Sequence, residues 1–257
     1  MCLTYGRPQR ILEEAVQSFL LQDYPGEKEL LILNDFADHS ICFDHPQVTI
    51  VNVDTRFSSL GEKRNRAVDL CHHDLIAVWD DDDISLPCRL SFSISHYDET
   101  RRFFKASHSW VLSNGVLRGP SANRFHGAGL WHRSLFQQAG GYPPMDSGED
   151  AALEDAFRQI IGAPMNFPIQ PEDIYFIYRW GGTGSYHLSG YGRGRVGHDS
   201  VQQYVVRKVE QGAIRTGQIA LEPHWNEDYR TLVWSFVAEG HHRVDPGSAA
   251  GGQIPGE

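Results

Sequence analysis

LIAVWDDDD, residues 75–83, is the most informative segment of this chain. Its five apolar residues predict a buried strand, and four aspartates follow them without a break. Adjacent carboxylates repel one another, so a cation or hydrogen-bond donors must offset their charge. A divalent ion shared with phosphate oxygens is one solution, and a solvated acidic turn is the other. The preceding strand favours the ion, because it places the aspartates at the edge of a sheet.

Strand and helix signals alternate through the first half of the chain. Strands are predicted at residues 2–5, 29–33 and 48–53, and helices at 11–20 and from Ser59, with its capping partner Glu62, to Leu70. This order predicts an α/β fold with a mostly parallel central sheet flanked by helices. Ligands bind beyond the carboxyl ends of such strands. Thr4, Asp35 and the run Asp80–Asp83 each follow a predicted strand, so we expect them at one edge.

The second half predicts a smaller β/α portion. Residues 103–112 and 115–117 are predicted to form a hairpin, with further strands at 127–131 and 174–180. Ser147 is predicted to begin a helix that runs to about Ile161. Residues 181–197 contain seven glycines. A mobile lid that closes over a substrate and a flexible loop without a ligand are about equally good interpretations of this segment. We expect one domain over residues 1–245 and a disordered tail at 246–257.

Composition excludes several classes of protein. The 257 residues carry a formal charge of −10, which argues against non-specific binding of nucleic acid. The four cysteines lack CxxC spacing, so we expect reduced thiols and no zinc site. No apolar run is long enough to span a membrane, and the polar residues Arg7, Gln9 and Arg10 argue against a signal peptide. We expect a cytoplasmic protein that reaches a membrane surface only through a partner.

Two predicted helix starts carry candidate functional residues. Residues 61–65 open a helix whose N-terminus favours phosphate, and Arg64 can add a bidentate contact. Taken alone, a solvated helix face is the simpler interpretation. Glu149 and Asp150 stand at the start of another helix. They could supply a general base, or they could be ordinary capping acids. Taken in isolation, the motif favours capping. Glu154 and Asp155, one turn later, are weaker candidates.

Taken together, these segments resemble glycosyltransferase family 2, a large family with the GT-A fold. The likeness covers about residues 2–190, and five ordered motifs are more specific than any one of them. They are TYGRP at 4–8, LILND at 31–35, GEKRNRA at 61–67, WDDDDISLP at 79–87, and GGY at 140–142 with EDAAL at 149–153. Gly6 and Asn34 depart from the pattern, since Asn and Asp are frequent there.

The resemblance implies roles for individual residues. Nucleotide-sugar binding would fall to Thr4, Tyr5, Arg7, Asp35, Arg64, Asp80 and Asp81, with Asp35 at the base and Asp81 at the ribose or donor sugar. Asp82 would be the main metal ligand, with help from Asp80, and Asp150 would be the catalytic base. His187 would be a further ligand of the metal or diphosphate.

The resemblance also implies a reaction. Residues 1–100 would bind a nucleotide-diphosphate sugar, with UDP as the first guess, and residues 101–225 would bind the acceptor. A hexosyltransferase of this type would use Mn²⁺ or Mg²⁺ and pass the sugar to a carbohydrate or other hydroxyl with inversion. Two alternatives remain open. One is a sugar nucleotidyltransferase, although the Gly-rich, Lys-bearing loop expected after Thr4 is missing, and the other is a non-catalytic sugar-binding module.

Overall fold

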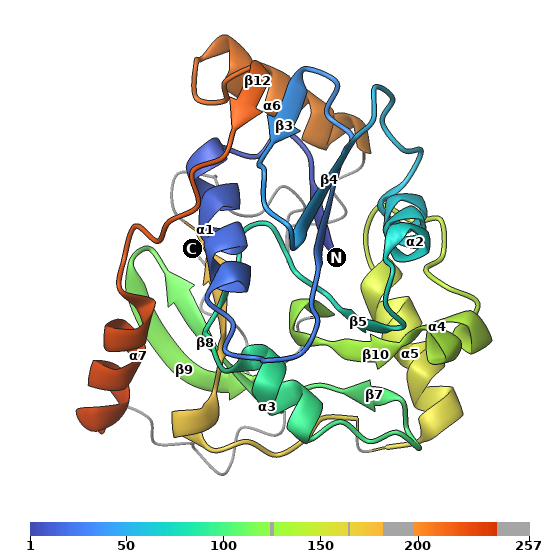
Figure 1. The fold of residues 1–257 in the computed structure, drawn as a ribbon, viewed down its shortest axis with the longest axis vertical. Coiled ribbons are helices and arrows are strands. Elements are labelled where there is room, and N and C mark those ends of the chain that lie inside the picture. The colour runs from blue at the N-terminus through green and yellow to red at the C-terminus, as the bar shows by residue number, and fades with distance from the viewer. Residues whose placement is uncertain (124–125, 164, 182–197, 241–257) are drawn as a thin grey trace.

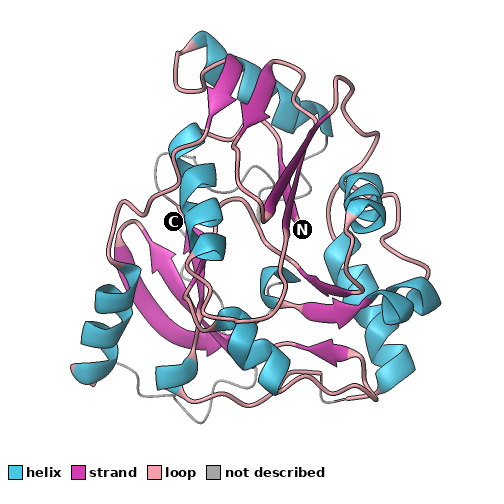
Figure 2. Ribbon diagram, viewed as in Figure 1, coloured by secondary structure: helices cyan, strands magenta, loops and turns pink. Residues whose placement is uncertain are grey.

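The computed structural model describes residues 1–123, 126–163, 165–181 and 198–240. His187, the rest of the glycine-rich segment from residue 182 to 197, and the tail at 246–257 lie outside these ranges. The predicted α/β class is confirmed, with helices packed around several small sheets (Figure 2). Within the described ranges, no helix has the length and apolar character needed to cross a membrane.

A parallel sheet forms the centre of the first half, as predicted. Its strands are β1 (Cys2–Thr4), β2 (Leu30–Asn34) and β4 (Val48–Asn52), in the order β1-β2-β4. All five residues of β2 are buried. Leu30 and Ile32 pack in the core beneath α1 (Gln9–Leu20), whereas Leu31 and Leu33 pack with α2 (Leu60–Leu70). The two helices therefore cover opposite faces of the sheet (Figure 1).

The strand before the aspartates is shorter than predicted. It ends at Ala77 as β5 (Leu75–Ala77), because the next N–H groups leave the ladder. Val78 N–H donates to Gly129 O at 3.1 Å, and Trp79 N–H donates to Met1 O at 2.9 Å. Val78 and Trp79 are nevertheless buried beside the start of β1. The acidic run thus emerges next to the parallel sheet.

The second half forms two further sheets. The first has the order β5-β10-β7, with β10 (Leu130–His132) antiparallel to β7 (Phe103–Phe104). The second has the order β6-β11-β8-β9, with strands β6 (Ile84–Ser85), β11 (Phe176–Trp180), β8 (His108–Ser113) and β9 (Val116–Ala122). Since β11 is parallel to β8 and antiparallel to β6, this sheet is mixed.

Two predictions for this half need correction. The hairpin turns at Asn114 and Gly115, both with positive φ, as predicted, but Phe103 and Phe104 belong to the other sheet. The strand predicted at 127–131 begins only at Leu130, because residues 126–128 form the short 3-10 helix η1 (His126–Ala128). The first error arises from pairing with a distant segment, and the second from a turn of 3-10 helix ahead of the strand.

The remaining helices frame these sheets. Helices α2, α4 (Arg133–Ala139) and α5 (Glu149–Ile161) share one apolar core and lie on one side of the molecule in Figure 1. Helix α7 (Tyr229–Ala238) lies on the opposite side of the molecule (Figure 1). The remaining short elements are α3 (Arg89–Ser95) and η2 (Pro171–Asp173).

The C-terminal elements return to the first half of the chain. Strand β12 (Gly217–Ala220) pairs in parallel with β3 (His39–Cys42), and α6 (His198–Glu210) lies beside them (Figure 1). Val205 of α6 packs on Gly6, whose φ is +55°. A Cβ at this position would overlap the Val205 methyl groups. Close packing and the backbone conformation together explain why glycine occupies the turn after β1.

Candidate functional site

Arg7 neutralises the centre of the acidic run. Its Nη2 donates to Asp81 Oδ1 at 2.7 Å and lies 3.3 Å from Asp82 Oδ2. All three side chains are buried. Burial opposes the charge on Arg7, but the two carboxylates outweigh it and raise the arginine pKa. The expected donor for the repelling aspartates is therefore a guanidinium from the turn after β1.

Asp83 and Asp80 have different surroundings. Asp83 Oδ1 accepts a hydrogen bond from the Arg179 backbone N–H at 2.8 Å. Burial, followed by the charges of Asp82 and Asp80, raises the pKa of Asp83 well above its ordinary value. Asp80 is half-buried, and its carboxylate lies where a Cβ on Gly127 would stand. Asp80 therefore borders η1, from the second half of the chain.

Arg179 links the acidic run to helix α1. Its side chain is fully buried, its Nε donates to the Asp82 backbone carbonyl, and its Nη1 pairs with Glu14 of α1. Glu14 Oε1 also accepts from Tyr229 Oη at 2.8 Å. Sequence reasoning missed Arg179. The available signal was a lone cation in an otherwise apolar strand, because a buried charge needs a partner.

Arg89 provides a second buried link near the same run. Its guanidinium donates to the backbone carbonyls of Val78 and Gly127, the latter at 2.7 Å, and to Ser85 Oγ at 2.8 Å. Burial lowers the pKa of Arg89 to about 10. The residues on either side of the aspartates are thus tied to η1 by one side chain.

Two of the three predicted strand ends meet at Lys63. Its Nζ donates to the Thr4 carbonyl at 2.7 Å and pairs with Asp35 Oδ1, and Asp35 Oδ2 accepts from Phe57 N–H at 3.1 Å. Burial lowers the pKa of Lys63, and Asp35 opposes that change. The negative charge of Asp81 also raises the pKa of Lys63. Sequence reasoning chose Arg64 and missed Lys63, although Lys63 lies one turn before buried Ala67 on α2.

Two features of this edge are open to a ligand. Thr4 Oγ1 is buried and has no hydrogen-bond partner in the part of the chain that the structure describes. Such an atom is costly unless a ligand or water satisfies it. The half-buried ring of Tyr5 packs edge-on against Phe36, with centroids 5.2 Å apart, and Arg56 lies 4.0 Å from its centre. A flat base could stack on such a surface.

Helix α5 begins later than predicted. Its N-cap is Gly148 with φ of +82°, and no side chain caps the helix, so Ser147 is not its start. Glu149 is buried, and its Oε1 lies 2.9 Å from Arg64 Nε. Burial opposes the charge on Arg64, but Glu149 outweighs it and raises the arginine pKa. An ion pair rather than a serine cap therefore fixes the start of α5.

Asp150 is left facing a cavity. The side chain is half-buried, and Oδ1 accepts from the Ala151 N–H at 2.7 Å. It has no ion pair within the described residues. Besides Glu149, the charges of Asp80 and Asp150 raise the pKa of Arg64, so the acidic run and the start of α5 both lie near this guanidinium.

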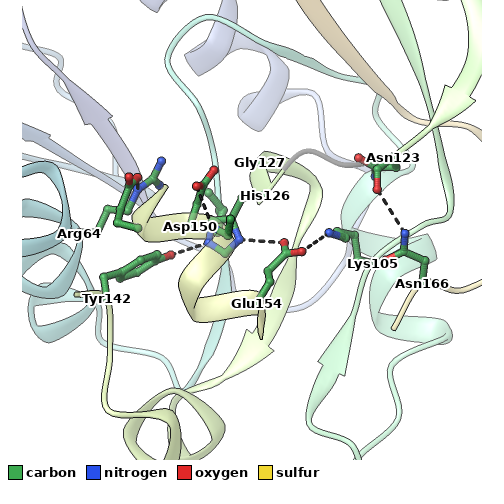
Figure 3. A network of polar contacts seen from close by, with 12 residues as sticks. Arg64, Lys105, Asn123, His126, Gly127, Tyr142, Asp150, Glu154 and Asn166 are labelled. Carbon is green, nitrogen blue, oxygen red and sulfur yellow. Dashed lines mark hydrogen bonds and ion pairs between the residues drawn. The ribbon is translucent and has the colours of Figure 1, made fainter. Parts of the chain in front are cut away.

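A buried polar chain anchors α5 one turn later (Figure 3). Tyr142 Oη lies 2.6 Å from His126 Nε2, and His126 Nδ1 lies 3.0 Å from Glu154 Oε1. Lys105 donates to the other Glu154 oxygen. Burial opposes the charge on Glu154, but His126 and Lys105 outweigh it and lower the glutamate pKa to about 2. Because a carboxylate only accepts, His126 donates from Nδ1, and its Nε2 accepts the hydrogen bond from the Tyr142 hydroxyl.

The cavity beside Asp150 has a volume of about 270 Å³. Its lining comes from α5, η1 and the segments around β7 and β9, and consists of Lys105, Asn123, His126, Asp150, Ala151, Glu154, Asp155, Arg158 and Asn166. Sequence reasoning missed His126 and Lys105, since neither stands in a motif. This lining offers hydrogen-bond donors and acceptors to a polar ligand.

The acidic run suits one kind of metal site. Within the described residues, no group of three or more His, Cys, Asp or Glu side chains could hold an ion. Mg²⁺ and similar hard ions, however, often use one or two carboxylates and complete their shell with substrate phosphates. Asp80 and Asp82 have the oxygen donors for that arrangement. His187, the other predicted ligand, lies outside the described residues.

Solved structures share this fold. S. aureus TarS 1-349 in complex with UDP-GlcNAc matches with a TM-score of 0.54 and 15% identity, over 81% of this chain and 65% of that chain. The mannosyltransferase PcManGT from Pyrobaculum calidifontis, in complex with GDP-Man and Mn²⁺, matches with a TM-score of 0.53 and 16% identity, over 72% and 57%. This chain therefore spans less than two thirds of either.

Sequence comparisons give the family. A search of curated proteins finds no match. The sequence model described as "Glycosyl transferase family 2" matches residues 3–138, which is more than half of the chain. This range contains the parallel sheet, the acidic run and η1. The protein is therefore a member of glycosyl transferase family 2 with the GT-A type of fold.

Proposed function

We propose that this protein transfers a sugar from a nucleotide-diphosphate sugar to an acceptor hydroxyl, with inversion at the anomeric carbon. One observation carries the proposal: the Asp150 carboxylate lines a polar cavity at the start of α5, which the Arg64–Glu149 ion pair ties to α2. A base beside the acceptor and an acidic edge beside the diphosphate are the two parts that such a transfer needs. Family membership supports the same reaction class.

The donor would lie at the carboxyl ends of the parallel strands. The Thr4 hydroxyl, without a partner among described residues, and the Tyr5 ring offer a hydrogen bond and a stacking surface there. Asp35 would orient the base or the ribose, with Lys63 fixing its carboxylate. The two solved relatives bind UDP-GlcNAc and GDP-Man, which favours a nucleotide-diphosphate sugar as the donor. Their nucleotide bases differ, so they do not indicate which base this protein binds. UDP is the first donor nucleotide to test.

Asp82, with help from Asp80, would hold Mn²⁺ or Mg²⁺ together with the donor diphosphate. When bound, such an ion would stabilise the negative charge that develops on the departing diphosphate. Arg7 keeps Asp81 and Asp82 in place through its two contacts. Asp81 would then reach the ribose or donor sugar.

The chemical step would be a single displacement. Asp150 accepts the proton of the acceptor hydroxyl, and the freed electron pair of that oxygen forms the new bond to the anomeric carbon. The bond from that carbon to the diphosphate oxygen breaks, and its electron pair leaves with the diphosphate. Attack from the opposite face inverts the centre. The Arg64–Glu149 ion pair and the Glu154 chain hold α5, so that Asp150 meets the hydroxyl in one position.

Thermal stabilisation by nucleotides tests the donor site. UDP, GDP and dTDP are each added with and without Mn²⁺, and we expect one of them to raise Tm only with the metal. The variant Asp82→Asn should lose the metal-dependent rise and most turnover, while Asp69→Asn, on an exposed face of α2, should keep both. No stabilisation by any nucleotide at millimolar concentration, or near-wild-type turnover in Asp82→Asn, would contradict the proposal.

A further inference from the structure

The cavity beside Asp150 also restricts the chemistry of the acceptor. On the basis of the proposed function, we infer that it selects an uncharged polyhydroxyl acceptor, such as a neutral sugar, over apolar and anionic ones. Two observations carry this inference: eight of the nine lining residues have polar side chains, and within the described residues their charges pair with one another except for the Asp150 carboxylate.

The lining disfavours an apolar acceptor. Only Ala151 among the nine lining residues has an apolar side chain. Carboxylates offer acceptors, whereas the ammonium, guanidinium and amide groups offer donors, and a sugar hydroxyl can use both kinds at once. A lipid tail or an aromatic ring would remove water from these groups without replacing the hydrogen bonds.

The charges disfavour an anionic acceptor. Two cations and three carboxylates line the cavity. At its buried end Lys105 pairs with Glu154, and at its exposed end Arg158 pairs with Asp155. Asp150 keeps no ion pair within the described residues. An entering anion would therefore face the Asp150 carboxylate and would have to compete with Glu154 and Asp155 for the two cations. A neutral sugar avoids both costs.

Matched acceptors test the charge selection. Methyl glucoside and methyl galactoside are compared with their uronides, in which only the terminal CH₂OH is replaced by a carboxylate. The full chain is used with UDP-GlcNAc or GDP-mannose, whichever raises Tm, and product is measured by mass. We expect kcat/KM to be about tenfold higher for the neutral member of each pair. This ratio should fall at high salt, because salt screens charge and leaves shape unchanged.

Asp155→Asn probes the same selection from the protein side. The variant keeps the side-chain size, removes one exposed carboxylate and releases Arg158. We expect kcat/KM for the uronides to rise and the ratio to shrink severalfold. Asp69→Asn makes the same change on an exposed face of α2 outside the cavity lining, and should leave the ratio unchanged. Donor hydrolysis in the absence of acceptor should match wild type in Asp69→Asn.

The possible outcomes distinguish a failure of the inference about the acceptor from a failure of the proposed function. Equal or better use of the uronides would overturn the charge selection. Donor hydrolysis without transfer to any neutral glycoside would overturn the acceptor class and leave the donor site standing. If the chain neither binds nor hydrolyses a nucleotide sugar, the proposed function itself fails.

Discussion

At the scale of single residues, charge pairing decides which carboxylates are available for chemistry. Asp81 and Asp82 contact Arg7, Asp83 accepts from a backbone N–H, and Glu149 pairs with Arg64. Within the described residues, the Asp150 carboxylate accepts a hydrogen bond only from the Ala151 N–H of its own helix. A carboxylate with an open side can accept a proton from an incoming hydroxyl, whereas a paired one must first lose its partner.

Gly6 gives a prediction at this scale. Gly6→Ala places a methyl group against Val205 and forces a positive φ on a residue with a side chain. We expect a loss of about 2–3 kcal/mol in the free energy of unfolding, measured with denaturant. In a Val205→Ala background the clash disappears and only the backbone strain remains, so the loss should be smaller. An equal loss in both backgrounds would show that Val205 does not cause it.

At the scale of elements, β11 and α1 hold the acidic run in position. Arg179, the penultimate residue of β11, contacts the run on one side and Glu14 of α1 on the other. The run is therefore part of the packed core rather than a solvated turn. This arrangement makes its geometry depend on residues far away in the sequence.

Glu14→Gln tests that dependence. The variant leaves the Arg179 charge buried with a neutral neighbour, and we expect the free energy of unfolding to fall by about 3 kcal/mol. Metal-dependent stabilisation by the donor nucleotide should weaken as well, since the run loses its support. Glu27→Gln, an exposed glutamate, serves as control and should change neither quantity. Unfolding free energies equal to wild type would mean that the Glu14–Arg179 pair does not support the run.

The sequence predicts the elements whose signal is local. Strand β2 is a continuous apolar run, and α2 has a capping serine that accepts from the Glu62 N–H, so both appear where they were expected. Strands β7 and β10 were misplaced because their limits depend on pairing with each other. In the site, the acidic run stands in a sequence motif. Arg179 stands in none, and Lys63 stands in the GEKRNRA motif without a local sign of its role, because the partners of both lie tens of residues away.

At the scale of the whole molecule, buried ion pairs join the two halves. Arg64 of α2 reaches Glu149 of α5, and Arg179 of β11 reaches Glu14 of α1. Helix α6 and strand β12 then pack back onto the first half. Unfolding of either half would break these pairs, so we expect stability to depend on pH.

Glu154 sets one part of that dependence. Its pKa is about 2 in the folded protein, against an ordinary value of 4.5, because His126 and Lys105 outweigh the effect of burial. The unfolded chain therefore binds more protons between these values. The stabilisation is present above pH 4.5 and is lost as pH falls toward 2. It amounts to about 3 kcal/mol. Denaturant unfolding between pH 6 and 3 should show a steeper loss for wild type than for Glu154→Gln, and parallel curves would refute this assignment.

The most direct test of the account is sugar transfer by Asp150→Asn. The asparagine keeps the shape of the side chain but cannot take the proton, so transfer should fall by about 100-fold or more. Stabilisation by the donor nucleotide and metal should stay at the wild-type level, because the donor edge is untouched. Asp69→Asn, on an exposed face of α2, should keep its transfer to neutral acceptors. Transfer near the wild-type rate in Asp150→Asn would contradict the assignment of Asp150 as the base.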